Sequence, residues 1–241
     1  MMHAIAFCVV IMLGFLIEAT LGFGGTVAAL PICSMIVGIR VAIPAITMIV
    51  CAASLAIVIQ DRAYIAWKAY VVMLLFMLVG MPVGMAVYTY LPEAPLKIAL
   101  GFFTVLVALK GFFCKQRDGE TSISVRHLIC LLAGGMVHGA FSCGGVLTVM
   151  YANRAVKDKR AYRVTLSAIW FSLNLLISVK NLLTGGITGQ IAGLACISIP
   201  FVAAAVAVGN ILLRKLDTAA FVKLVYVMLL VSGVLMVMQA A

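Results

Sequence analysis

Eight apolar segments follow one another along the sequence, and each is long enough for a membrane-spanning helix, which needs about 20 mostly apolar residues. The segments cover residues 4–38, 41–60, 66–90, 95–114, 128–151, 161–183, 190–213 and 219–240. Of all residues, 66% are hydrophobic and 10% are charged, a balance that a water-facing surface cannot use. We therefore expect an all-α polytopic membrane protein. The short stretches between the segments exclude an appended catalytic or nucleic-acid-binding domain.

The formal net charge of +10 does not indicate a nucleic-acid partner, because membrane proteins collect lysine and arginine in cytoplasmic loops. The seven cysteines form no C-x-x-C pair, which argues against a disulfide framework and a zinc site. We expect no metal and no cofactor. The motifs G-x-S-x-G and H-E-x-x-H are absent, as is a pair of membrane aspartates. We therefore expect no catalytic residues and no enzyme activity.

The second half of the sequence repeats the first. The matching pairs are Gly14 with Gly134, Glu18 with His138, Gly24 and Gly25 with Gly144 and Gly145, Thr47 with Thr165, Ser54 and Leu55 with Ser172 and Leu173, Arg62 with Lys180, Pro82 with Pro200, and Gly84 with Gly209. Glycines, prolines and charges that match in order through a whole half indicate a duplication, as is typical of secondary transporters.

A glycine-rich break interrupts the first segment of each half. As one helix, residues 4–38 would be about 50 Å long, nearly twice the thickness of the bilayer core. Glycine is costly inside helices and permits unwound backbone, which is tolerated at membrane depth where it lines a protein-enclosed cavity. We place one helix break at 22–25 and a second at Gly144 and Gly145. Close packing of helices through small residues is the alternative reading.

The distribution of lysine and arginine favours a topology in which both broken segments are re-entrant hairpins. If all eight segments cross the membrane, the 17 lysines and arginines divide ten to seven between the two faces. With two hairpins, one face keeps only Arg40, Lys97 and Lys180, and the other receives the remaining fourteen. The second division fits the positive-inside rule far better.

This topology predicts two inverted repeats, each made of a re-entrant hairpin and three transmembrane helices. The first repeat covers residues 1–114, a cytoplasmic linker covers 115–126, and the second repeat covers 127–241. Both termini then face the periplasm or the exterior. The two hairpin tips approach the midplane from opposite sides, where inverted-repeat transporters bind their substrates.

Beyond the paired breaks, Pro31 follows the first one, and the first half closes on Pro82-x-Gly84 and on Leu-Pro-Glu-Ala-Pro-Leu-Lys at 91–97. In these features the chain resembles the sulfite exporter TauE/SafE family over nearly its whole length. The resemblance implies a permease of the plasma membrane, the inner membrane of a bacterial cell, that exports or imports sulfite, an organosulfonate or a related sulfur-containing or organic anion. It leaves the substrate and the direction of transport open.

The candidate substrate-binding residues surround the two breaks. A helix N-terminus offers unpaired N–H groups and a partial positive charge to an anion, and hydroxyl groups add donors. The predicted residues are Thr20, Gly24, Gly25, Thr26, Ser142, Cys143, Gly144 and Gly145, with Ser54 and Asn174 from neighbouring helices. The alternative for Ser54 and Asn174 is a hydrogen bond between helices.

Glu18 and His138 are ionisable groups at membrane depth. Each lies six residues before the glycine pair of its break. Intramembrane carboxylates are costly and by default functional, and histidine titrates near physiological pH. We therefore expect this pair to carry a coupling proton, with a structural hydrogen bond as the alternative. The competing function is a metal-cation permease that uses Glu18, His138 and Cys143. The expected partners are the lipid bilayer, a small anion and a coupling proton or sodium ion; a homo-oligomer is left open.

Overall fold

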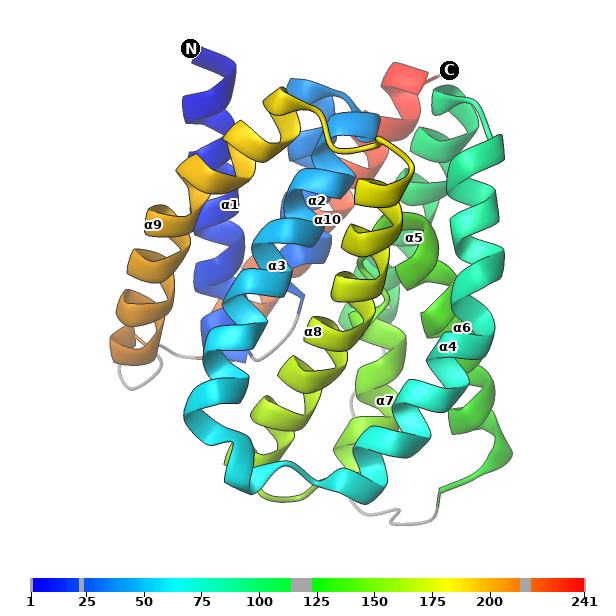
Figure 1. Cartoon of the computed structure of the whole chain (residues 1–241), viewed down its shortest axis with the longest axis vertical. Coiled ribbons are helices and arrows are strands. Elements are labelled where there is room, and N and C mark those ends of the chain that lie inside the picture. The colour runs from blue at the N-terminus through cyan, green and yellow to red at the C-terminus, as the bar shows by residue number, and fades with distance from the viewer. Residues whose placement is uncertain (1, 22–23, 114–122, 213–217, 241) are drawn as a thin grey trace. The chain divides into compact units, whose positions relative to one another are not determined.

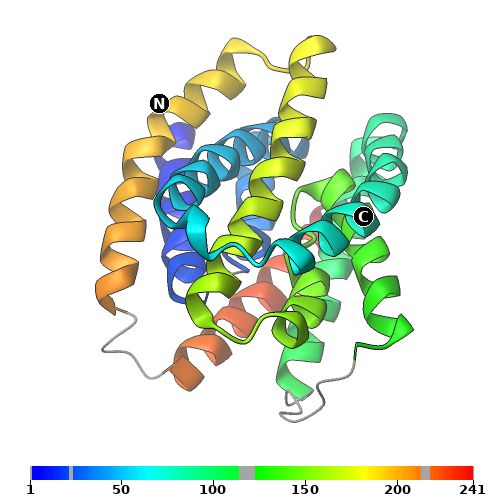
Figure 2. The same ribbon diagram turned by 60° about the horizontal axis from the view of Figure 1, so that its bottom comes forward.

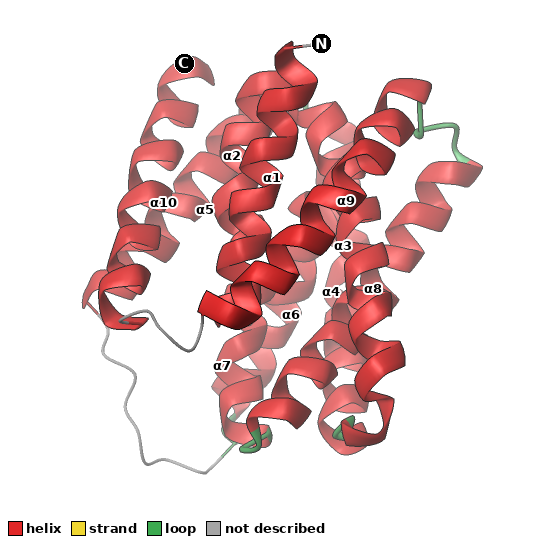
Figure 3. Ribbon diagram, turned by 90° about the vertical axis from the view of Figure 1, so that its left-hand side faces the viewer, coloured by secondary structure: helices red, strands yellow, loops and turns green. Residues whose placement is uncertain are grey.

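The computed structural model describes residues 2–21, 24–113, 123–212 and 218–240. Every regular element in this part of the chain is a helix (Figure 3). The helices are α1 (Met2–Leu21), α2 (Gly25–Val37), α3 (Ile39–Asp61), the short 3-10 helix η1 (Arg62–Tyr64), α4 (Trp67–Tyr90), α5 (Glu93–Phe113), α6 (Val125–Phe141), α7 (Gly145–Ala155), α8 (Lys159–Leu183), α9 (Gly189–Leu212) and α10 (Thr218–Ala240).

Both predicted breaks are present. Residues 4–38 divide into α1 and α2, and residues 128–151 divide into α6 and α7. The same order, a divided segment followed by three long helices, therefore occurs twice in the described chain. At 1.5 Å per residue, α2 and α7 are about 20 Å and 17 Å long, too short to cross a core of about 30 Å alone. The inversion of the second half stays a prediction.

Four of the described helical segments are long and apolar enough to cross a membrane: Ile39–Tyr64, Trp67–Tyr90, Lys159–Leu183 and Gly189–Val208. Shorter apolar helices cover Met2–Glu18, Gly25–Val37, Val125–Phe141 and Tyr226–Gln239. These shorter helices include α1 and α2 of the first broken pair and α6 of the second.

The chain forms two compact units, and each contains parts of both predicted halves. The first unit is Met1–Ile43, Leu91–Arg117 and Gly193–Ala241, and the second is Pro44–Tyr90 and Asp118–Ala192. Two of the unit boundaries fall inside α3 and α9, and another lies between α4 and α5. The compact units are therefore not the two repeats that the sequence predicts, although each unit holds one of the two broken helix pairs.

In the first unit, α1 packs against α2, and α5 packs against α10 (Figure 1). Gly101 and Gly233 allow α5 and α10 to meet, because a Cβ on either glycine would lie 2.8 Å from the carbonyl oxygen of the other. The Cys8 Sγ of α1 lies 3.5 Å from the Ser198 Oγ of α9. Small residues thus bring these helix backbones close together, as in many membrane proteins.

In the second unit, α4 and α6 lie side by side (Figure 1). Gly80 and Gly84 of α4 face Leu132 and Met136 of α6, and a Cβ on either glycine would overlap the facing carbonyl oxygen. On α6, Gly135 and Gly139 face the backbone of α4 in the same way. Each helix thus contributes two glycines four residues apart, which is the small-residue spacing of close helix pairs. This contact joins a helix from each predicted half.

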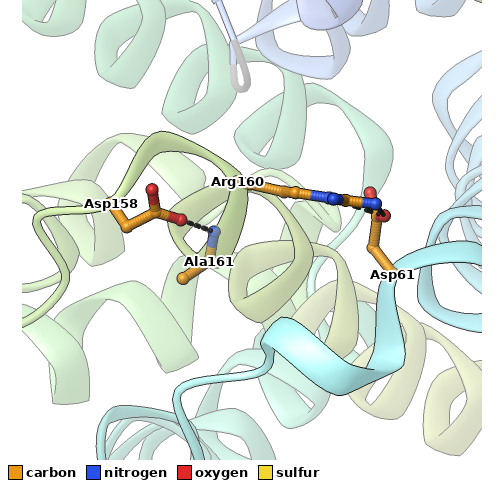
Figure 4. Close-up of polar contacts among 4 residues, drawn as sticks. All are labelled: Asp61, Asp158, Arg160 and Ala161. Carbon is orange, nitrogen blue, oxygen red and sulfur yellow. Dashed lines mark hydrogen bonds and ion pairs between the residues drawn. The ribbon is translucent and has the colours of Figure 1, made fainter.

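At one end of the second unit, η1 contacts the start of α8 (Figure 2). The Arg160 guanidinium donates to Asp61 Oδ1 from Nε at 2.9 Å and from Nη2 at 2.6 Å, and it lies 3.9 Å from the centre of the Tyr64 ring. Asp158 caps α8, because its Oδ1 accepts a hydrogen bond from the Ala161 N–H at 2.7 Å (Figure 4). These contacts fix the end of α3 to the beginning of α8.

Candidate functional site

The first broken pair is an antiparallel helical hairpin. A Cβ on Gly25, the first residue of α2, would overlap the Gly14 carbonyl oxygen and lie 2.8 Å from the Glu18 Cβ. Farther along α2, Ala29 faces Gly14, with 2.8 Å between its Cβ and the Cβ position of that glycine. Gly24 precedes α2 with φ 89°, a left-handed conformation that glycine adopts without steric cost. Glycine is therefore required here for the turn and for the close approach.

The Glu18 carboxylate binds the start of α2. Its Oε2 accepts a hydrogen bond from the Thr26 backbone N–H at 3.2 Å and another from the Thr26 hydroxyl at 2.9 Å. Thr26 is the second residue of α2. A carboxylate at this point satisfies a free N–H group and interacts favourably with the helix dipole. Both donors that Thr26 was expected to offer to a substrate are thus bound to Glu18.

The second broken pair has the same form. A Cβ on Gly144 would overlap the Gly134 carbonyl oxygen and lie 2.9 Å from the His138 Cβ. Ser142 ends α6 with φ 54°, a conformation that side-chain-bearing residues seldom adopt. Its N–H donates to the His138 carbonyl at 2.7 Å, and its hydroxyl lies 2.7 Å from the Thr47 hydroxyl of α3. The Ser142 hydroxyl is thus bound to another helix of the same unit.

His138 lies at the centre of this second hairpin and is 1% exposed. Its ring stacks on the Trp170 indole of α8, with centroids 5.5 Å apart. The same indole lies beside Gly145, the first residue of α7, 3.4 Å from that glycine's Cβ position. His138, Trp170 and the start of α7 therefore form one group of neighbours.

Two polar groups in this cluster lack a hydrogen-bond partner among the described residues. They are the His138 imidazole, at both ring nitrogens, and the side-chain carbonyl of Asn174, which is fully buried on α8. The Asn174 side chain is nevertheless close enough to the His138 ring for a hydrogen bond between the two to form with a small adjustment, and its Nδ2 donates to the Trp170 carbonyl at 2.8 Å. Burying polar groups without partners costs free energy, and a bound ion or a functional role is one explanation for groups kept in that state.

No side chain within the described ranges accepts a hydrogen bond from the Gly145 or Val146 N–H at the start of α7. The residue before them is Gly144, which has no side chain that could cap the helix. The His138 Cβ lies 2.9 Å from the Cβ position of Gly144, the residue directly before these backbone donors, which are also without a side-chain acceptor. Both kinds of donor suit an anion.

The predicted site residues divide between the two units. The first unit holds Glu18, Gly24, Gly25 and Thr26; the second holds Ser54, His138, Ser142, Cys143, Gly144, Gly145 and Asn174. Cys143 is 3% exposed, and Ser54 of α3 is 5% exposed. Thr20 belongs to α1, but its side chain lies outside the described residues, as do Gly22, Cys114 and most of the predicted linker. The roles of these residues stay predictions.

Two neighbours of the second hairpin, Thr47 and Trp170, are absent from the predicted site. Thr47 had a sequence signal, since it matches Thr165 in the repeat. Trp170 is one of two tryptophans in the chain, and only the folded structure shows that it lies against His138 and Gly145.

Within the described part of the chain, no three side chains of His, Cys, Asp or Glu lie in a group that could hold a metal ion. This includes the residues named for the competing metal-cation permease. The described part of the structure therefore gives that alternative no ligand set.

Comparison with known proteins adds one match. The family model described as Sulfite exporter TauE/SafE matches residues 6–236, nearly the whole chain. No curated protein and no solved structure gave a match.

Proposed function

Because the chain belongs to the sulfite exporter TauE/SafE family, a family of membrane transporters of sulfite and related anions, we propose that it carries sulfite or a small organosulfonate in an ion-coupled cycle. The apolar helices make it a multi-pass membrane protein. We place it in the bacterial inner membrane, with both termini outside.

The observation that carries this proposal is the second hairpin. There the His138 imidazole, buried and without a partner, lies beside the start of α7. An oxyanion offers several acceptor oxygens, so it can bind the backbone N–H groups of α7 and a His138 N–H together. Sulfite, sulfonates and carboxylates all meet this requirement.

His138 also gives a route to coupling. A protonated imidazole has two N–H donors: one can bind the Asn174 side-chain carbonyl and the other an anion oxygen. A buried charge is costly unless it is paired, so a proton on His138 and an anion beside it stabilise each other. By linkage each then raises the affinity for the other. A proton would accompany the anion, and the net charge moved would fall by one.

Transport into proteoliposomes tests this function. We expect sulfite or a two-carbon sulfonate to accumulate when the pH is lower on the side of entry, and divalent metal ions not to enter. A sodium gradient of the same size separates sodium coupling from proton coupling. If divalent metals are transported and none of the anions is, the proposed function is wrong.

Two histidines of α6, His138 and His127, provide a test variant and a matched control for proton coupling. His138→Gln should abolish gradient-driven accumulation. His127→Gln, at the other end of α6, should not, because His127 has its own local partner: its Nδ1 accepts from the Ser124 N–H at 3.0 Å. If proton-driven accumulation survives in His138→Gln at the wild-type level, His138 is not the coupling group.

A further inference from the structure

The two hairpins place residues of opposite chemistry at the same position. The close-packed glycine of the first hairpin is Gly25, the first residue of α2, which lies against Gly14 and Glu18. That of the second is Gly144, the residue just before α7, which lies against Gly134 and His138. The corresponding Cβ separations are 2.8 Å to Glu18 and 2.9 Å to His138. Glu18 and His138 are therefore equivalent by their backbone contacts, independently of any alignment.

At this position the first hairpin already holds an anion of its own. The Glu18 carboxylate accepts from the N–H and the hydroxyl of Thr26, which are the kinds of donor that a helix N-terminus offers to a bound oxyanion. A carboxylate tethered beside its donors has a high effective concentration and outcompetes a free anion of similar size.

The second hairpin cannot fill its helix terminus in this way. His138 has no carboxylate. By the same contacts Gly145 stands where the first hairpin has Thr26, and neither Gly145 nor the next residue, Val146, has a hydroxyl, so the hydroxyl donor is missing as well. In place of an acceptor the second hairpin has a buried imidazole whose nitrogens lack a partner in the described structure, beside an Asn174 carbonyl in the same state. Asn174 can pair with one nitrogen of the imidazole, and the other nitrogen is open to a ligand from outside the chain.

We propose that Glu18 is a tethered anion that occupies the first hairpin, so that each chain binds one substrate anion, at the start of α7 with His138. The position of the substrate rests on the proposed function; the occupation of α2 by Glu18 does not. The duplicated architecture therefore contains one anion site that is permanently filled and one that exchanges its ligand.

Formate tests the first hairpin. Glu18→Ala leaves the Thr26 donors without their acceptor, and loss of such a cap should lower the thermal midpoint in detergent by about 2–8 °C. Formate should restore most of that loss with saturation, while it leaves the wild type unchanged. Glu93→Ala is the matched control, because it removes an exposed carboxylate that is paired with Lys97 at 3.6 Å on the first turn of α5. If formate stabilises Glu18→Ala no more than Glu93→Ala, the tethered-anion role is wrong.

Binding stoichiometry tests the second part. Isothermal titration with a two-carbon sulfonate should give one site per chain in the wild type and in Glu18→Gln, whose amide keeps the shape of the side chain. His138→Gln should weaken that binding at least tenfold. In a Glu18→Ala, His138→Gln chain, formate rescue should persist although sulfonate binding is lost. Two sulfonate sites in the wild type would overturn the proposal. If the wild type binds neither the sulfonate nor sulfite, the proposed function is wrong, and the formate result alone decides the role of Glu18.

Discussion

The imidazole of His138 stacks on the indole of Trp170, with ring centroids 5.5 Å apart and ring planes inclined by 19°. Because the indole also lies against Gly145, it holds the imidazole beside the start of α7. The orientation of His138 thus depends on a residue from a different helix, α8. A donor held in place before its ligand arrives loses less conformational freedom on binding.

We predict that Trp170→Leu weakens sulfonate binding by about two- to tenfold, since aromatic pairs contribute about 0.5–1.5 kcal/mol beyond the area that they bury. Trp170→Phe should lose less, because a ring remains for stacking. Trp67→Leu is the control: this tryptophan is 60% exposed on α4 and should leave the affinity unchanged. The measurement is isothermal titration in detergent. Equal losses in Trp170→Leu and Trp67→Leu would refute a specific role for Trp170.

Ser142 gives a prediction about backbone conformation. At φ 54° a side chain costs about 1 kcal/mol or more, so Ser142→Gly should have a thermal midpoint roughly 2–4 °C above that of Ser142→Ala. Both variants lose the hydroxyl contact with Thr47. Thr47→Val removes the other hydroxyl of this contact and leaves the turn at Ser142 unchanged, so it measures the loss of the hydroxyl contact alone. If the alanine variant is as stable as the glycine variant, the left-handed turn at Ser142 is not strained.

Local sequence was enough to predict the breaks. Paired glycines inside an overlong apolar segment leave few alternatives, and the ends of α1 and α6 fall where the pattern places them. It also predicted that Glu18 and His138 lie beside the breaks, because helix geometry fixes positions within one hairpin. The helix breaks and the positions of Glu18 and His138 depend on residues close together in the sequence, so they can be predicted from a single segment.

Contacts between distant segments were not predictable in this way. Pro82 and Gly84 were noted as repeat matches and as a family feature, and the structure gives Gly84 a physical reason, its contact with Met136 of α6. Nothing in α4 alone selects α6 as its partner. The role of Thr26 changed for a different reason: its hydroxyl was expected to face a substrate, and the hairpin turns it toward Glu18 of the same hairpin, an orientation that the residue pattern does not specify.

Gly84 supplies a packing prediction. Gly84→Ala would place a methyl group on the Met136 carbonyl oxygen, and overpacking of this kind costs about 1–3 kcal/mol, or roughly 2–10 °C in thermal midpoint. Gly193→Ala in α9 is the matched control, because nothing lies within 4 Å of its Cβ position. That variant should be as stable as the wild type. A similar midpoint for both variants would mean that α4 and α6 are less closely packed than in the structure.

Asp61 and Asp158 lie at the same end of the second unit but act by different means (Figure 4). Asp158→Ala removes the cap of α8 and should cost about 1 kcal/mol, most of which remains at high salt because the cap is a hydrogen bond. Asp61→Ala removes a pair whose arginine side chain is 55% exposed, so its cost should stay below about 1 kcal/mol and fall as salt screens the charges. Thermal melts at low and high salt measure both. A loss in Asp158→Ala that disappears at high salt would contradict its role as a cap.

The last prediction concerns the side of the membrane on which the loops lie. The fourteen-to-three division of lysine and arginine predicts that the linker at Gln116 and the α7–α8 loop at Lys157 are both cytoplasmic. In a chain whose native cysteines are replaced, single cysteines at these two positions should resist a membrane-impermeant thiol reagent applied to intact cells. The second cysteine is placed at Lys157 and not at its neighbour Asp158, because the Asp158 side chain caps α8.

A cysteine at Gln190, which is exposed on the first turn of α9, is the control for labelling from outside. It should react, because the loop before it follows Lys180 on the opposite face. All three should react after the cells are opened. Since α6 and α7 alone separate Gln116 from Lys157, labelling of only one of these two positions from outside would mean that the second hairpin crosses the membrane, and the inverted-repeat topology would be wrong.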